Sequence, residues 1–193
     1  MNLLLVREFL PDIEMPDFGK AFLRHMESKT NLSVRTASLN AWALLAEGLN
    51  RLGLPLYEAE FEETGKPRFR NSGLCFSLSH SGRCAAVLIA DSPCGVDIEE
   101  IREIKENLVQ RCMHPEELAS DMDFFEAWTK KECLAKLDGS GMRSHPNAIN
   151  TLEYAGWLTR RFSSSINMQY HLSAICESRE AMEPVFLHKN SGL

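Results

Sequence analysis

Hydrophobic residues along the chain follow the repeat of a helix in some stretches and that of a strand in others. Residues 36–52 carry Leu39, Trp42 and Leu49 on one stripe, at the spacing of an amphipathic helix. In residues 167–177 apolar side chains instead occupy every second position, as in a strand with one face toward a core. The chain is therefore expected to mix helices and strands.

The same patterns, with the positions of Pro, Gly and capping residues, predict the remaining elements. Further helices are expected over residues 17–27, 101–112, 114–118 and 124–137. Further strands are expected over residues 3–6, 74–78, 84–90, 94–99, 151–158 and 184–188. Ser79–Gly82 reads as the tight turn of a hairpin. Helices beside a hairpin occur in both parts of the chain, which predicts an α+β fold of two similar halves, residues 1–93 and 94–193, packed as one unit.

Composition limits the classes of protein and partner. The 193 residues are 44% hydrophobic and carry a formal net charge of -6, which argues against a general nucleic-acid-binding role. No apolar run is long enough to span a bilayer, and the first residues lack the features of a signal peptide. The six cysteines form no Cys-x-x-Cys pair, so neither structural zinc nor a disulfide framework is expected. We expect a cytoplasmic protein with reduced thiols and with neither nucleic acid nor membrane as partner.

The stretch Cys94–Glu99 carries the most informative acidic residues. On a strand, Asp97 and Glu99 share one face, while Val96 and Ile98 point the other way into a core. Two carboxylates side by side repel each other unless a cation lies between them, and such oxygen ligands suit Mg²⁺. An isolated Asp-x-Glu is more simply a turn residue followed by the start of a solvated helix.

The predicted helix 124–137 carries a second charged group. Asp121 or Asp123 is expected to cap it, and Trp128, Glu132 and Lys136 are spaced four apart and share one face. A Glu–Lys pair at this spacing is usually a solvated ion pair. Because the same stripe begins with a tryptophan, we expect it to be partly buried and to line a cleft.

Two further sites could bind an anion. The Ser79–Gly82 turn offers small side chains, free backbone N–H groups and the imidazole of His80, which can hold a phosphate, although such a turn usually makes only its own hydrogen bonds. Arg35 lies just before the expected helix 36–52, where a cation is mildly unfavourable for the helix dipole. It is either kept for a partner or is an ordinary exposed arginine.

Four motifs together resemble the 4′-phosphopantetheinyl transferases of the surfactin-synthetase-activating type. They are Gly-Lys-Pro at 65–67, Phe-Ser-Leu-Ser-His-Ser-Gly at 76–82, Gly-Val-Asp-Ile-Glu at 95–99 and the segment 128–141. The resemblance implies a monomer with a pseudo-two-fold pair of similar α/β halves and an active site in the cleft between them. It also implies a reaction, in which the phosphopantetheine arm of coenzyme A moves to a serine of an apo acyl or peptidyl carrier protein and adenosine 3′,5′-bisphosphate is released.

The resemblance carries over to particular residues. Asp97, Glu99 and Glu132 match magnesium-binding acids, and Lys136 matches a lysine near the reacting phosphate. The positions that match coenzyme A contacts are Arg35, Lys66, Ser79 and His80. Chemistry agrees: a serine hydroxyl is a poor nucleophile, and attack on a diphosphate builds negative charge that Mg²⁺ neutralises. We expect Glu132, or a water that it orients, to take the serine proton, which makes Asp97, Glu132 and Lys136 the catalytic residues.

Three other functions stay open from the sequence. A non-catalytic relative would bind coenzyme A or a carrier protein, but it would have no use for the Glu132–Lys136 pair. Another Mg²⁺-dependent phosphoesterase could use the same acids. A purely structural protein is the third alternative. Which carrier protein is modified cannot be read from these residues.

Overall fold

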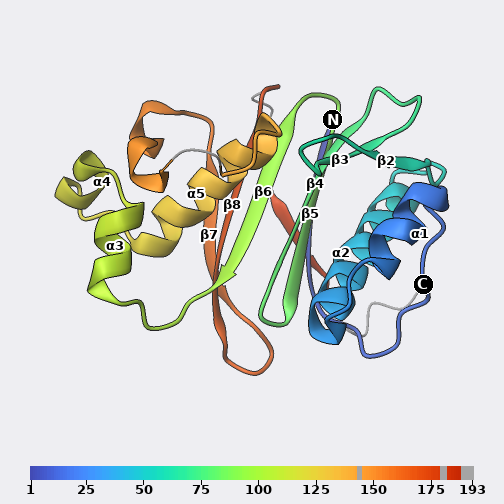
Figure 1. Cartoon of the computed structure of the whole chain (residues 1–193), viewed down its shortest axis with the longest axis horizontal. Helices are drawn as coiled ribbons and strands as arrows, with labels where there is room; N and C mark the ends of the chain where they lie inside the picture. Colours follow the sequence, from blue (N-terminus) through green and yellow to red (C-terminus); the bar gives the residue numbers. More distant parts are fainter. Residues whose placement is uncertain (143–144, 179–181, 188–193) are drawn as a thin grey trace.

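The computed structural model describes residues 1–142, 145–178 and 182–187, and it is a mixed helix and strand fold (Figure 1). The strands are β1 Asn2–Glu8, β2 Ala59–Phe61, β3 Pro67–Phe69, β4 Cys75–Ser81, β5 Cys84–Ala90, β6 Cys94–Glu100, β7 Leu158–Ser163, β8 Gln169–Cys176 and β9 Pro184–Leu187. The α-helices are α1 Gly19–Glu27, α2 Leu32–Arg51, α3 Glu106–Cys112, α4 Pro115–Ala119 and α5 Phe124–Leu137. Two short 3₁₀ turns, η1 Pro146–Ala148 and η2 Thr151–Glu153, follow α5. The predicted α+β class is confirmed.

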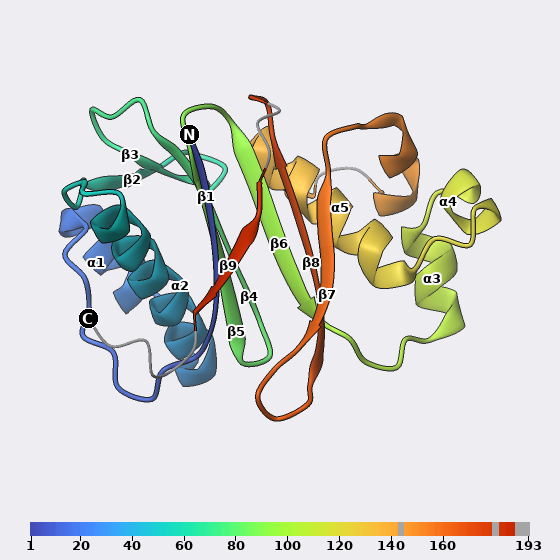
Figure 2. The ribbon, with the colours of Figure 1, turned by 180° about the vertical axis from the view of Figure 1, so that it is seen from behind.

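The strands form three sheets. The first and largest sheet has the strand order β4-β5-β1-β9. The second is a small ribbon of β2 and β3, and the third sheet has the order β6-β8-β7. The last strand, β9, runs parallel to β1 at the edge of the first sheet (Figure 2). The strand expected at 184–188 is therefore confirmed over 184–187, and His188 lies outside the described residues. The predicted division into halves 1–93 and 94–193 stays a prediction. The strand β9 belongs to the second half by sequence but joins the sheet formed by strands of the first half.

The core is divided by the first sheet. On one side the helices α1 and α2 bury Phe22, Trp42 and Leu45 against it. On the other side Leu4 and Leu88 pack against residues of β6 and β8. Both faces of β5 are thus covered, which explains its unbroken apolar sequence. The helix α5 packs across the outer face of β6 and β8, so the two sheets lie between two sets of helices (Figure 1).

The helix α2 starts earlier than its apolar stripe suggests. Asn31 adopts an extended backbone and its side chain accepts hydrogen bonds from the backbone N–H groups of Ser33 and Val34. This cap begins the helix at Leu32. The expected start at residue 36 is wrong, and Arg35 lies within the first turn of the helix, not before it.

The predicted Ser79–Gly82 turn is also wrong. β4 continues through Ser81, which pairs with Cys84 of β5, so the two-residue turn is formed by Gly82 and Arg83. Gly82 has a φ of +54°, in the left-handed region that glycine enters readily, and a Cβ there would lie 2.1 Å from Glu100. Ser79 and His80 are consequently strand residues.

Two further boundaries differ from the expectation. The helix expected over 101–112 forms only over Glu106–Cys112, because Ile101 N–H still bonds to Gln169 O and extends the β-ladder. The strand expected over 151–158 is a 3₁₀ turn at 151–153, capped by the Asn150 side chain. β7 begins only at Leu158, beyond Gly156 with its positive φ.

Candidate active site

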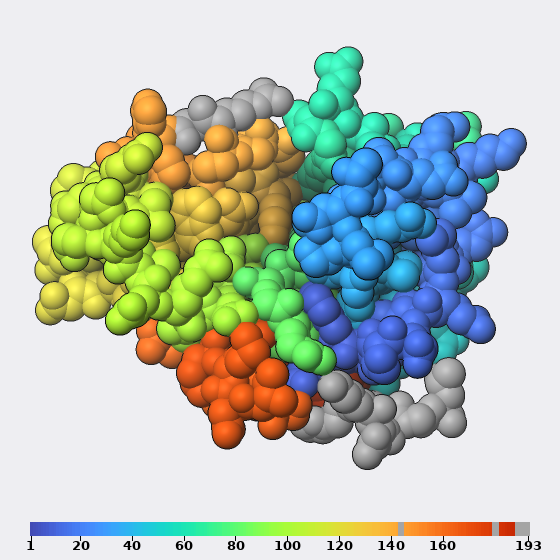
Figure 3. All heavy atoms as spheres, turned by 60° about the horizontal axis from the view of Figure 1, so that its bottom comes forward, coloured from blue at the N-terminus to red at the C-terminus, as the bar shows by residue number. Residues whose placement is uncertain are grey.

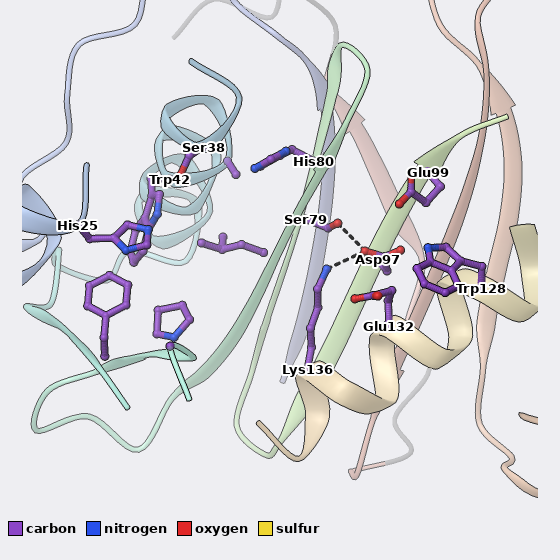
Figure 4. A pocket seen from close by; sticks show the side chains of 15 residues that line it. His25, Ser38, Trp42, Ser79, His80, Asp97, Glu99, Trp128, Glu132 and Lys136 are labelled. Carbon is purple, nitrogen blue, oxygen red and sulfur yellow. Dashed lines mark hydrogen bonds and ion pairs between the residues drawn. The ribbon is translucent and has the colours of Figure 1, made fainter. Parts of the chain in front are cut away.

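A cavity of ≈ 420 Å³ opens between α2 and β4 on one side and β6 and α5 on the other. In the space-filling view the surface is hollowed between the blue atoms of α2 and the gold atoms of α5 (Figure 3). Its charged and polar lining includes Ser79, His80, Asp97, Glu99, Glu132 and Lys136 (Figure 4). Most of the residues singled out in the sequence are thus brought to one place.

The strand β6 presents its acids as predicted. Val96 and Ile98 are fully buried in the core between the sheets, and Asp97 and Glu99 point to the face that α5 covers. α5 can approach because residue 95 is glycine: a Cβ there would lie 2.1 Å from the carbonyl oxygen of Cys133. The alternation along this strand therefore places the carboxylates beneath the helix.

Asp97 is buried, with 4% of its surface exposed. Its Oδ1 accepts hydrogen bonds from Ser79 Oγ and from Lys136 Nζ, both at 2.7 Å (Figure 4). Its Oδ2 is also buried but has no hydrogen-bond partner among the described residues. A buried carboxylate oxygen without a partner is costly, and it marks a place where a further ligand would be stabilising.

Glu99 lies two residues beyond Asp97 on β6, on the same face of the strand. Ser81 Oγ donates to its Oε2 at 2.7 Å. Burial raises the pKa of Glu99. The hydrogen bond from Ser81 opposes this rise, the negative charge of Asp97 adds to it, and the net shift is upward. The negative charge of Asp97 therefore disfavours the ionised form of Glu99.

The helix α5 supplies the facing groups. It has the predicted bounds, begins at the Asp123 cap and is followed by Gly139 with a φ of +71°. Burial and the charge of Asp97 raise the pKa of Glu132. Burial lowers the pKa of Lys136, but the adjacent Asp97 carboxylate outweighs it and the pKa is raised overall. Lys136 is thus held as a cation, which also donates to Val96 O at 3.1 Å.

The residues present fit a divalent cation in their chemistry. Asp97, Glu99 and Glu132 line the same cavity with carboxylate oxygens, and Asp97 has its unpartnered Oδ2. Within the described part of the chain, no three His, Cys, Asp or Glu side chains are grouped closely enough to hold a metal ion. In this structure the positive charge paired with Asp97 is the ammonium group of Lys136.

The predicted coenzyme A contacts are more spread out. Ser79 and His80 line the cavity. Lys66 lies in an adjoining cavity of ≈ 250 Å³, which shares Lys136, and its ammonium donates to Leu137 O at 2.9 Å. Arg35 is on the first turn of α2 and is not among the residues that line this cavity, although Ser38 and Trp42 of the same helix are.

Several residues of the site were not anticipated from the sequence. His25 stacks on Phe61 at 4.4 Å and 18°, and Trp42, assigned from the sequence only to a helical core stripe, also borders the cavity. Ser81 was placed in a turn, although it holds Glu99. The signal for Ser81 is present in the sequence as serines at every second position from 77 to 81.

Comparison with known proteins points to one superfamily. A family model described as the 4′-phosphopantetheinyl transferase superfamily matches residues 93–180. The 4′-phosphopantetheinyl transferase AcpT of Salmonella typhi is 36% identical over 138 residues, which cover 63% of this chain and 69% of that protein.

Two other relatives match over shorter stretches. The 4′-phosphopantetheinyl transferase psf-1 of Bacillus pumilus is 34% identical over 101 residues, 46% of this chain and 43% of that protein. The 4′-phosphopantetheinyl transferase gsp of Aneurinibacillus migulanus is 35% identical over 89 residues, 42% of this chain and 37% of that protein. The chain thus spans less than half the length of these two relatives. From the match to two thirds of AcpT, together with the family model over β6 and α5, we conclude that the chain belongs to the 4′-phosphopantetheinyl transferase superfamily.

Proposed function

We propose that this protein transfers the 4′-phosphopantetheine group of coenzyme A to a serine of an apo acyl or peptidyl carrier protein, releasing adenosine 3′,5′-bisphosphate. The observation that carries the proposal is the facing of Asp97 and Glu99 on β6 with Glu132 and Lys136 on α5 in one cavity. Relatives bearing the name 4′-phosphopantetheinyl transferase support the reaction class.

The acids Asp97, Glu99 and Glu132 would hold Mg²⁺ in this proposal. When bound, Mg²⁺ would neutralise charge that develops on the diphosphate of coenzyme A. Glu132, or a water that it orients, takes the proton of the serine hydroxyl. Lys136 donates to the reacting phosphate as a point charge.

The remaining polar residues would bind the nucleotide part of the substrate. We assign Ser79 and His80 to the coenzyme A phosphates, Lys66 to the region of the adenine nucleotide and Arg35 to the 3′-phosphate. The proposal includes a cytoplasmic monomer with two similar halves and with the substrate in the cleft between them. Its cavity lies between elements of the N-terminal and C-terminal parts of the chain, as that arrangement requires.

The test is transfer itself. The full chain is incubated with coenzyme A, Mg²⁺ and a panel of apo carrier proteins, and each carrier is weighed by mass spectrometry. The proposal requires that at least one carrier gain a phosphopantetheine group, with adenosine 3′,5′-bisphosphate released in equal amount. Binding of a carrier without a mass change would favour a non-catalytic module, and phosphate release without any carrier would favour a phosphoesterase.

A further inference from the structure

The two large sheets are joined by serine side chains. β4 is an edge strand of the first sheet and β6 an edge strand of the third, and the two lie side by side in parallel (Figure 1). Three alternate serines of β4 accept hydrogen bonds from three alternate backbone N–H groups of β6. The pairs are Val96 N to Ser77 Oγ at 3.0 Å, Ile98 N to Ser79 Oγ at 3.3 Å and Glu100 N to Ser81 Oγ at 3.1 Å. We call these three contacts the serine ladder.

Two of the three serines also act on the acids. A hydroxyl has one hydrogen to donate and lone pairs that accept, so one serine can do both. Ser79 Oγ donates to Asp97 Oδ1 and Ser81 Oγ donates to Glu99 Oε2, both at 2.7 Å. These short contacts from a hydroxyl to a carboxylate are charge-assisted hydrogen bonds.

The third serine lacks this second contact for a simple reason. In each case the serine bonds to the carboxylate eighteen positions later, and eighteen positions after Ser77 the chain has Gly95, which carries no side chain. Among the described residues, the Ser77 hydroxyl makes only the strand-to-strand bond with Val96 N. Ser77 is therefore an internal control, equal to its two neighbours in joining the sheets but without a carboxylate to hold.

We propose that Ser79 and Ser81 are positioning residues that fix the carboxylates of Asp97 and Glu99 for the divalent cation. The inference rests on the proposed function, in which these acids hold Mg²⁺. Each serine binds one oxygen of its carboxylate from the β4 side, so the rotation of both side chains is restrained before any cation arrives. In Asp97 this leaves Oδ2 as the buried oxygen without a partner. Ligand carboxylates are commonly oriented by such outer contacts.

A purely structural role predicts something different. If the serines only joined the sheets, removing any one of them would lower stability and would affect metal binding in proportion to that loss. In the positioning role, the two effects separate, since only two of the three serines touch an acid. Because Ser79 is also assigned to the coenzyme A phosphates, the comparison of Ser77 with Ser81 decides between the roles, and Ser79 supplies a second comparison.

The experiment uses the full chain and Mn²⁺ as the probe, in the presence of saturating coenzyme A. Free Mn²⁺ is followed by electron paramagnetic resonance for the wild type and for Ser77→Ala, Ser79→Ala and Ser81→Ala, and urea unfolding is measured on the same samples. We expect Ser79→Ala and Ser81→Ala each to weaken Mn²⁺ binding roughly ten-fold. Ser77→Ala should stay within about two-fold of the wild type, although it loses a comparable amount of stability.

Two further variants keep the test decisive. Ser81→Thr retains the hydroxyl and should restore Mn²⁺ affinity to near the wild-type value. Ser79→Cys keeps the size but donates weakly, so it should fall between wild type and Ser79→Ala, and it replaces Ser79→Ala if that protein does not fold. Equal Mn²⁺ affinity in the three alanine variants would overturn the positioning role. A wild type that takes up no Mn²⁺ would refute the metal assignment of the proposed function, and the inference with it.

Discussion

Asp97 is the residue on which most interactions of the site converge. It accepts from a serine of β4 and from the ammonium of Lys136 on α5, and its second oxygen is buried without a protein partner among the described residues. A neutral amide of the same shape would keep the packing but lose the charge. The carboxylate is thus more important for the chemistry than for the shape of the cavity.

Asp97→Asn should therefore abolish transfer while leaving the protein folded. A lost metal ligand removes several kcal/mol of charge stabilisation, so we expect the rate of carrier modification to fall at least about 100-fold. The measurement is a rate by mass spectrometry at saturating Mg²⁺, beside a circular dichroism spectrum. A near-normal rate would contradict the assignment of Asp97 to the metal.

Arg35 is the opposite case, since it is predicted to bind a part of the substrate that does not react. Arg35→Ala should raise KM for coenzyme A and leave kcat nearly unchanged, as expected for uniform binding. It should not lower Tm, because a cation in the first turn opposes the helix dipole. Arg51→Ala, at the other end of α2, is the matched control and should leave KM unchanged. A collapse of kcat with KM intact would show that Arg35 has another role.

At the scale of elements, α5 is held in place by a buried ion pair. Lys131 Nζ lies 2.8 Å from Glu117 Oε2, and neither side chain is exposed. Lys131 also donates to Ile149 O, and Glu117 Oε1 accepts from both the N–H and the hydroxyl of Thr151. Because Lys131 precedes Glu132 in the same helix, this anchor sets the position of the carboxylate that we propose as catalytic.

Removing one partner of that pair should be costly. We expect Glu117→Ala to lower the free energy of unfolding by about 3–5 kcal/mol, since it leaves the Lys131 ammonium buried and unpaired. The pair of Glu58 with Arg70, at 3.2 Å, is exposed, and Glu58→Ala should cost only about 0.5 kcal/mol. Urea unfolding measures both. Equal losses would show that burial does not distinguish the two pairs.

At the scale of the whole molecule, four layers place the site between them. The helices α1 and α2, the first sheet, the third sheet and α5 follow one another, and the cavity opens where α2 and α5 approach across β4 and β6.

All six cysteines are free thiols. No helix among the described residues combines the length and the apolar character needed to cross a bilayer.

The stability of this arrangement should fall in mild acid through His171. The ring is buried between β8 and α5, where Nδ1 lies 3.1 Å from Thr129 Oγ1, and burial lowers its pKa below 6.5. In the unfolded chain His171 therefore binds a proton at a higher pH than in the folded chain. Its contribution to the free energy of unfolding is fully present above about pH 6.5 and is lost as the pH falls below that value.

Two proteins and two pH values isolate this residue. The free energy of unfolding of the wild type is compared with that of His171→Gln at pH 7.5 and at pH 5.5. We expect the wild type to lose more stability than the variant between these values. Because His25 and His80 also have lowered pKa values and are common to both proteins, their contribution cancels in the difference. An equal loss in the two proteins would contradict the role of His171.

Local sequence signals alone predicted α5 and the orientation of β6. The Asp123 cap and a periodic stripe define the helix, with Gly139 just beyond its end, and strict alternation sends Asp97 and Glu99 to one face. These features depend on neighbours within a few residues, which is why they could be read without a structure.

The tertiary structure decided what the polar residues of β4 do. Ser79–Ser81 has the composition of a turn, and it is a strand only because β5 supplies a paired backbone and β6 supplies N–H groups for the hydroxyls. Which oxygen of Asp97 is engaged likewise depends on groups eighteen and thirty-nine positions away. Residue types and their periodicity thus determined which chemical groups are available. Contacts between distant segments, which no local pattern encodes, decided their partners.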